Sequence, residues 1–344
     1  MTYRQVAVQG ALALVALVAA YFTWQRDAEL APGEVVVVDV SKGELVGVRF
    51  EDQEKSTWVE LGRATDDNGA FISVHLSPQE ETKKPAGAKE PAAASSKTPD
   101  RVVRGSEAAE KLFASFAPLR ASRSLGVLAA DKLKDLGLAS SQKRITLTLR
   151  NGKRTFAIAP APPGGAEPYL RDEQDGRVYV VGRSFLSDFA SATSLLVERR
   201  AHAFRLEDAD RMVVTRGTVR REFLISKSED GVRLAPAGAP DKPDAAVKTW
   251  HDRIFAVWPV EVLGKDEAPA EGAPQLDLRI DYSARGHRLG FVEIAKVPAV
   301  SSSVEQDAKD AKDTLYARSE RSLGWFKLSA DAHSLLSEAQ GILR

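Results

Sequence analysis

The segment ITLTLRNGKRTFAI, residues 145–158, carries two runs of alternating character on either side of an Asn151-Gly152 pair. Alternation of apolar and polar side chains is typical of a strand that buries one face, and Asn-Gly between two such runs is a strong hairpin signal. The segment therefore predicts two antiparallel strands, 145–149 and 154–158, joined by a tight turn.

Further strand signals precede this hairpin. Two extended runs lie between residues 34 and 50, and the runs 57–61 and 70–76 flank the tetrad DDNG at 66–69. Acidic side chains in that tetrad could offer calcium ligands, but the spaced acidic pattern and late glutamate of an EF-hand are missing. A turn is the favoured interpretation, and these runs predict a second hairpin.

Helical patterns alternate with the strands. Residues 106–119 place their apolar side chains on one helical stripe, with Ser106 as N-cap and acidic residues in the first turn. A shorter helical turn, ADKLKDLGL, ends at Gly137 as a C-cap. Strands at 169–171 and 177–181 follow, and a further helix is predicted from Ser184.

The second half of the chain repeats this order of elements. Strands within 210–235, a helix at 244–258, a strand pair at 276–282 and 287–294, and a strand-turn-helix segment at 315–339 echo the first half. We therefore predict an α+β fold made of two repeated units of antiparallel sheet with packed helices. The first repeat covers 34–200 and the second 204–344, with the join near 199–205.

Both repeats carry insertions. Residues 78–100 are rich in Pro, Ala, Lys, Glu and Ser and contain no large apolar side chain. Such a segment cannot bury enough surface to offset its ordering entropy, so we predict a disordered insertion inside the first repeat. The second repeat has predicted flexible insertions near 236–244 and 299–313.

The run VAVQGALALVALVAAYFTW, residues 6–24, contains no charged side chain. At about 1.5 Å per residue it covers roughly 28 Å, close to the ~30 Å hydrocarbon core of a bilayer, which predicts a transmembrane helix within an anchor at 1–30. A cleaved signal peptide, cut before Tyr21, is the alternative. Aromatic residues at the end of the run favour retention. Arg4 lies before the run, and the weak bias of basic residues predicts a cytoplasmic N-terminus and a periplasmic body on the inner membrane.

Composition limits the classes of function. The 344 residues include 48 Lys and Arg and 48 Asp and Glu, so the formal net charge is zero. This balance argues against nucleic acid as a partner, because a nucleic-acid-binding protein carries a basic surface. The chain has no cysteine, which excludes disulfides, an acylated lipobox cysteine and thiolate chemistry.

Several segments resemble a known family. The helix at 106–119, the KLKDLGL turn, the hairpin at 145–158 and YLRDEQDGRVYVVGRSFLSDF at 169–189 are similar to the bacterial domain of unknown function 4340. The similarity covers 34–200 well and the second repeat more loosely, and Leu136 stands where the family usually has tyrosine. The resemblance implies an anchored accessory protein, often encoded beside ABC-2-type permease and ATPase subunits and a gliding-motility-type component. It implies no catalytic residues, because the family has none assigned.

Catalytic motifs are scarce. Walker A, G-x-S-x-G and H-E-x-x-H patterns are absent. Ser140 and Lys143 form an S-x-x-K pattern, but the SDN and KTG boxes that accompany it in penicillin-binding enzymes are missing. The acids at 207–210 could hold a cation, although a solvated turn is favoured. We therefore predict no enzyme activity and no catalytic, cofactor or metal site.

The histidines and tryptophans carry expectations of their own. No metal-ligand spacing links the histidines, so each is predicted to be a surface or half-buried polar residue. Core packing is the favoured role of three tryptophans, with a carbohydrate or peptide platform as the alternative. The histidines are His75, His202, His251, His287 and His333, and the tryptophans are Trp250, Trp258 and Trp325.

These observations lead to two hypotheses of function. The first is a membrane-anchored, non-catalytic accessory or scaffold protein of the cell envelope, held in the bilayer by residues 6–24 and working with an ABC-type permease or ATPase or another envelope complex. The alternative is a periplasmic receptor that binds a glycan, lipid or peptide in a groove between the two repeats. A third possibility, an enzyme that uses Ser140 and Lys143 or the acids at 207–210, requires those groups to meet a partner base or ion.

Overall fold

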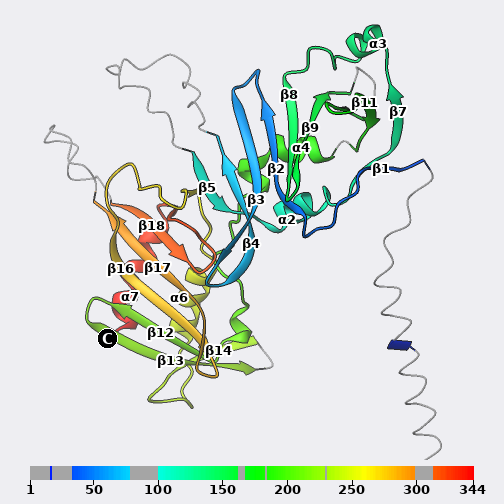
Figure 1. Cartoon of the computed structure of the whole chain (residues 1–344). Coiled ribbons are helices and arrows are strands. Elements are labelled where there is room, and N and C mark those ends of the chain that lie inside the picture. Colours follow the sequence, from blue (N-terminus) through cyan, green and yellow to red (C-terminus); the bar gives the residue numbers. More distant parts are fainter. Residues whose placement is uncertain are drawn as a thin grey trace, which may run out of the picture.

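The computed structural model describes residues 16–17, 33–77, 100–161, 167–182, 184–228, 231–298 and 313–344. These residues form three antiparallel sheets with a small number of helices packed on them (Figure 1). Within these ranges no helix has the length and apolar character that crossing a membrane requires. Only Ala16 and Leu17 of the predicted anchor are described, so that prediction lies outside the described residues, as do most of the insertions at 78–100 and 299–313.

The larger sheet has nine strands, and the predicted hairpins are part of it. Leu149 lies opposite Gly152, and Asp66 lies opposite Gly69, which confirms both hairpins. In spatial order the strands are β5 (Arg101–Arg104), β4 (Gly69–Leu76), β3 (Thr57–Asp66), β2 (Leu45–Asp52), β8 (Lys143–Leu149), β9 (Gly152–Ala159), β10 (Tyr169–Asp172), β11 (Arg177–Val180) and β7 (Arg123–Val127). Strands β1 (Val35–Val38) and β6 (Leu119–Ala121) form a separate two-stranded sheet.

Helix α2 (Glu107–Ala114) begins where the sequence predicts. The Ser106 hydroxyl oxygen accepts a hydrogen bond from the backbone N–H of Ala109, at 3.4 Å, and so caps the helix. The helix ends well before residue 119, which corrects the predicted length. Pro118 has no N–H and disfavours helical geometry in the residue before it, so the chain leaves the helix and Leu119 starts β6 instead.

Three short helices complete this part of the chain. Helix α3 (Ala130–Asp135) is followed by Gly137 at φ +72°, the left-handed conformation expected of a C-cap glycine. Helices α4 (Ser184–Ala190) and α5 (Ala192–Leu195) follow β11, and Phe189 of α4 is buried against the sheet.

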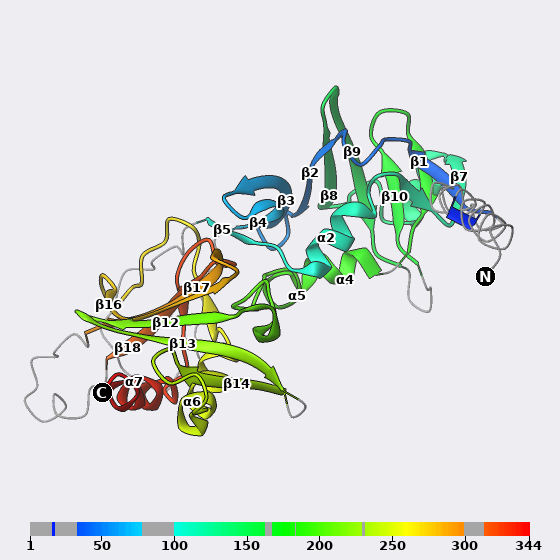
Figure 2. The same ribbon diagram turned by 90° about the horizontal axis from the view of Figure 1, so that it is seen from below.

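The third sheet has eight strands and two covering helices. Figure 2 shows α6 (Ala245–Phe255) and α7 (Ala332–Ile342) together on one of its faces. The indole N–H of Trp250 on α6 donates to the carbonyl of Leu335 on α7, at 2.9 Å. In spatial order the strands are β14 (Gly231–Pro236), β13 (Val219–Ser228), β12 (Arg211–Arg216), β16 (Gln275–Ala284), β17 (His287–Val297), β18 (Thr314–Ser319), β19 (Phe326–Lys327) and β15 (Glu261–Val262). The 3-10 helix η1 (Leu206–Asp208) precedes β12.

Two large hydrophobic clusters define two lobes. The first cluster runs from Val37 to Val197 and the second from Ala201 to Ala339. We call residues 33–200 the first lobe and residues 201–344 the second lobe. Val262 packs against both clusters, so the lobes share apolar contact where β15 lies.

Candidate functional site

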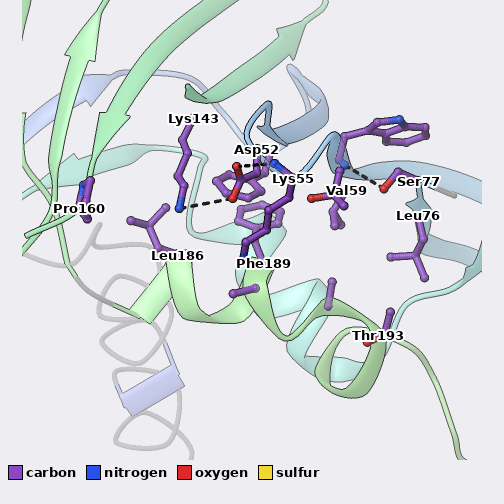
Figure 3. A pocket seen from close by; sticks show the side chains of 15 residues that line it. Asp52, Lys55, Val59, Leu76, Ser77, Lys143, Pro160, Leu186, Phe189 and Thr193 are labelled. Carbon is purple, nitrogen blue, oxygen red and sulfur yellow. Dashed lines mark hydrogen bonds and ion pairs between the residues drawn. The ribbon is translucent and has the colours of Figure 1, made fainter. Parts of the chain in front are cut away.

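A cavity of about 310 Å³ opens in the first lobe. One wall comes from the end of β2 and the start of β3, and the opposite wall comes from α4 and α5 (Figure 3). The volume lies at the lower end of the range of small-molecule sites, roughly 300–1,000 Å³. The predicted groove between repeats would lie elsewhere, because this cavity is lined by the first lobe alone.

A carboxylate and an ammonium meet in the cavity. Asp52 is the last residue of β2, and the pairing of β2 with β8 sets it directly opposite Lys143. The Nζ of Lys143 lies 3.4 Å from Oδ2 of Asp52, whose side chain is 5% exposed. The backbone N–H of Lys55 donates to Oδ1, also at 3.4 Å. Both contacts to this buried carboxylate are long for charge-assisted hydrogen bonds.

Aromatic rings line the same cavity. Phe50 and Phe189 stack with their ring centroids 5.2 Å apart and their planes 13° from parallel. Trp58 lies on the β3 side, and the guanidinium of Arg49 sits 4.2 Å from its ring centroid. The hydroxyl of Ser77 accepts from the N–H of Trp58 at 3.0 Å and so ties the ends of β3 and β4 together. The cavity thus joins one charged corner to apolar walls.

The S-x-x-K pattern does not form a catalytic pair. Lys143 enters the cavity, but Ser140 is exposed and is not among the cavity's lining residues. Ser141, the next residue, donates its hydroxyl to the carbonyl of Ile158. The third possibility therefore loses its proposed nucleophile, because Lys143 pairs with Asp52 and not with a serine hydroxyl.

The acidic segments serve local turns. In the tetrad at 66–69, Asp66 accepts from the N–H of Asn68 at 2.9 Å and pairs with Arg104. In the segment at 207–210, Asp208 accepts from the N–H of Arg205 at 3.0 Å within the turn, and Asp210 accepts from the distant N–H of Arg285 at 2.6 Å. The local hydrogen bonds of Asp66 and Asp208 fit the predicted turns, and Arg104 and Arg285 add long-range contacts to Asp66 and Asp210.

A second region of interest is the junction between the lobes. Edge strand β5 of the nine-stranded sheet is hydrogen-bonded to the loop that follows β15, because the N–H of Lys265 donates to the carbonyl of Val102, at 2.9 Å. Arg101 on β5 lies 2.8 Å from Glu261 and 2.8 Å from Glu267. The edge of one lobe is thus hydrogen-bonded and ion-paired to the other.

Glu198 is a second point of contact at the junction. Its carboxylate pairs with Arg200 and with Arg321 of the second lobe. Burial would raise the pKa of Glu198, but the hydrogen bonds from Arg200 and the charge of Arg321 outweigh it and hold the pKa below its ordinary value. The cavity beside these residues measures about 10 Å³, room for no more than one water molecule.

An exposed apolar surface lies beside the junction. Trp258 is 61% exposed and Val260 57% exposed, and Arg199 donates to the carbonyl of Pro259 between them. We call the exposed side chains of Trp258 and Val260 the Trp258 surface; Pro259 between them is buried. The predicted core role of Trp258 is wrong, because α6 ends at Phe255 and the helical periodicity no longer applies beyond it. Trp250, inside the helix, is buried as predicted.

Two of the five histidines are buried, contrary to the prediction of surface or half-buried positions. His251 is fully buried and His202 is 9% exposed, and both rings contact Tyr282. The Nδ1 of His202 lies 3.2 Å from a carboxylate oxygen of Glu320. Periodicity could have placed His251 near the buried stripe of α6, but its meeting with His202 depends on the path of the inter-lobe segment.

Two further searches, for metal-ligand groups within the described ranges and for related proteins, gave no result. Across the described residues, no group of three or more His, Cys, Asp or Glu side chains could hold a metal ion. Comparison of the chain with protein-family models, with curated proteins and with solved structures gave no match.

Proposed function

We propose that the chain is a membrane-anchored, non-catalytic accessory protein of the bacterial cell envelope that works with an ABC-type transporter or a related envelope complex. Residues 6–24 hold it in the inner membrane, with the N-terminus in the cytoplasm and the two lobes in the periplasm. The resemblance to the bacterial domain of unknown function 4340 supports this class of partner.

The observation that carries the proposal is the Trp258 surface beside a fastened junction. Trp258 and Val260 expose apolar area that the fold does not use, and tryptophan is enriched among the residues that anchor protein interfaces. Ion pairs of Arg101 and Glu198 join the two lobes at the junction. A rigid surface loses less entropy on binding, which suits a scaffold.

The two lobes are best explained as copies of one unit. Seven strands of the nine-stranded sheet follow the order β4-β3-β2-β8-β9-β10-β11, and seven strands of the eight-stranded sheet follow the order β14-β13-β12-β16-β17-β18-β19. Helices α2 and α6 take corresponding places along the chain. Helix α2 lies between β4 and β8, and α6 lies between β14 and β16. An experimental structure whose lobes fail to superpose over these strands would rule out the duplication.

Crosslinking tests the partner. We expect the full-length protein, crosslinked in intact cells and gently solubilised, to carry a permease or ATPase subunit. Trp258→Ser should abolish this product, whereas Leu276→Ser, a change at another exposed apolar residue, should leave it unchanged. Recovery of an uncrosslinked monomer under several conditions contradicts the proposal.

Labelling tests the topology. The chain has no cysteine, so Val219→Cys at an exposed position gives a single reactive thiol. A membrane-impermeant maleimide should label it in spheroplasts before lysis. Labelling only after lysis would place the body in the cytoplasm and refute the proposed orientation.

A ligand receptor is the second candidate. The junction cavity of about 10 Å³ is far too small for a glycan, lipid or peptide, which disfavours the predicted groove between repeats. The cavity of about 310 Å³ within the first lobe favours a receptor of a different design.

A further inference from the structure

The cavity in the first lobe carries a net positive charge. Asp52, Lys55 and Lys143 are the charged side chains among its lining residues, which gives two positive charges against one negative. Figure 3 shows Lys143 reaching from the strands towards Leu186 on α4. A second anion would neutralise the excess charge, whereas a cation would have to displace Lys143 from Asp52.

The two lysines differ in what holds them. Lys143 is already 3.4 Å from Asp52, with its side chain 32% exposed. Lys55 lines the cavity and is exposed, and within the described part of the chain no salt bridge is found for its ammonium group. A lysine ammonium is a compact charge with three donors, so each can serve one oxygen of a carboxylate.

The rest of the lining is suited to an apolar body. Leu186 and Phe189 of α4 line the wall opposite the charged corner, and Phe50 lies on β2 two residues before Asp52. Taking roughly 30 Å³ for each water-sized group, a cavity of this size holds on the order of ten non-hydrogen atoms. These dimensions exclude a whole lipid and an oligosaccharide.

We propose that this cavity binds a small organic monocarboxylate with an apolar body, such as a medium-chain acyl or an arylalkyl carboxylate. The carboxylate binds between Lys143 and Lys55, and the body packs on Phe50 and Phe189. The proposal rests on the cavity alone and does not depend on the transporter partner.

A matched series of probes tests the head group. 3-Phenylpropanoate, 3-phenylpropanamide and 3-phenylpropylamine share one body and differ in charge. Titration calorimetry with the full-length protein in lipid nanodiscs should show binding of the carboxylate, with the amide weaker by roughly tenfold or more and the amine not bound. Tightest binding of the amine would make Asp52 the recognition group and overturn the proposal. Equal binding of all three, or of none, would also overturn it.

Variants test the residues. Lys143→Met should weaken the binding of 3-phenylpropanoate by roughly tenfold or more, since it removes a charge-assisted contact. Asp52→Asn should tighten the binding of the same ligand, because the ammonium of Lys143 is then free to pair with it. Lys153→Met, at an exposed lysine on β9 outside the cavity, is the control and should bind like the unaltered protein. Weaker binding by folded Asp52→Asn, or unchanged binding by Lys143→Met, contradicts the proposal.

Discussion

The ring nitrogen Nε2 of His251 lies 2.9 Å from the hydroxyl of Tyr282 in the core of the second lobe. Both residues are fully buried, and the rings of His202 and Phe255 pack around them. Burial of this kind favours the neutral imidazole, because a charged ring would lose its hydration. The core of this lobe therefore contains a group whose protonation opposes folding.

This burial predicts a loss of stability in mild acid. Burial lowers the pKa of His251 from 6.5 to about 4, against the opposing charge of Asp252 and with His202 and Lys248 adding to the shift. The unfolded chain binds the proton first, so the free energy of unfolding falls as the pH drops from about 6.5 towards 4. The contribution is roughly 3 kcal/mol at pH 4.

His251→Gln removes this titration and keeps a polar partner for Tyr282. Denaturant unfolding between pH 4 and 7 should therefore show a flatter stability curve for the variant. His287→Gln, at an exposed histidine, should keep the slope of the unaltered protein. An equal slope in His251→Gln and the unaltered protein would exclude His251 as the cause.

Substitution of Gly324 provides a steric test of the junction. A Cβ added there would overlap the carbonyl oxygen of Gly264, which is backbone and cannot rotate away. Gly324→Ala should therefore displace the loop that pairs with β5 and cost about 1–3 kcal/mol. Hydrogen exchange should show lost protection at the N–H of Lys265, which donates to Val102 in the intact junction.

Gly341 provides the matched control. It lies in α7, and a Cβ added there would meet no atom within 4 Å. Gly341→Ala should raise the free energy of unfolding by up to about 1 kcal/mol, because alanine favours the helix. Protection at Lys265 that survives in Gly324→Ala would contradict the predicted displacement of the loop.

Local patterns account for the parts of the fold that the sequence predicts. The hairpin at 145–158 depends on neighbouring residues alone, and so does the cap at Ser106. Strand β5 escapes prediction because its four residues, Arg101–Arg104, show only two apolar side chains, and it becomes a strand by pairing with β4. Edge strands of this kind owe their structure to their neighbours.

The candidate site depends on contacts that no local pattern contains. Asp52 meets Lys143 because β2 pairs with β8, and the chain between them holds several other elements. Phe189 reaches Phe50 only after α4 folds back over the sheet. The sequence does contain one usable signal, since Asp52 extends the alternating buried positions of the strand that holds Val48 and Phe50.

Arg101 predicts how much the junction contributes to stability. Its side chain is 23% exposed, and it pairs with Glu261 and with the more buried Glu267. Arg101→Met should lower the free energy of unfolding by about 1–2 kcal/mol, because Glu267 loses its charged partner. Arg205→Met is the control. The side chain of Arg205, which pairs with Asp208, is 82% exposed, so the loss of unfolding free energy should stay within about 0.5 kcal/mol. Equal costs for the two variants would show that the junction pairs behave as surface pairs.

The lowered pKa of Glu271 predicts a second dependence of stability on pH, at more acidic values. Hydrogen bonds from Lys327 and from the hydroxyl of Tyr316 lower the pKa of Glu271 from 4.5 to about 2. A lowered carboxyl pKa stabilises the fold above 4.5, and that stability is lost as the pH falls from 4.5 towards 2. Glu271→Gln should therefore cost stability near neutral pH, by about 1 kcal/mol once solvent screening is allowed for. The difference from the unaltered protein should shrink as the pH falls towards 2 in denaturant titrations. A difference that stays constant over this range would show that packing, and not the charge of Glu271, makes the contribution.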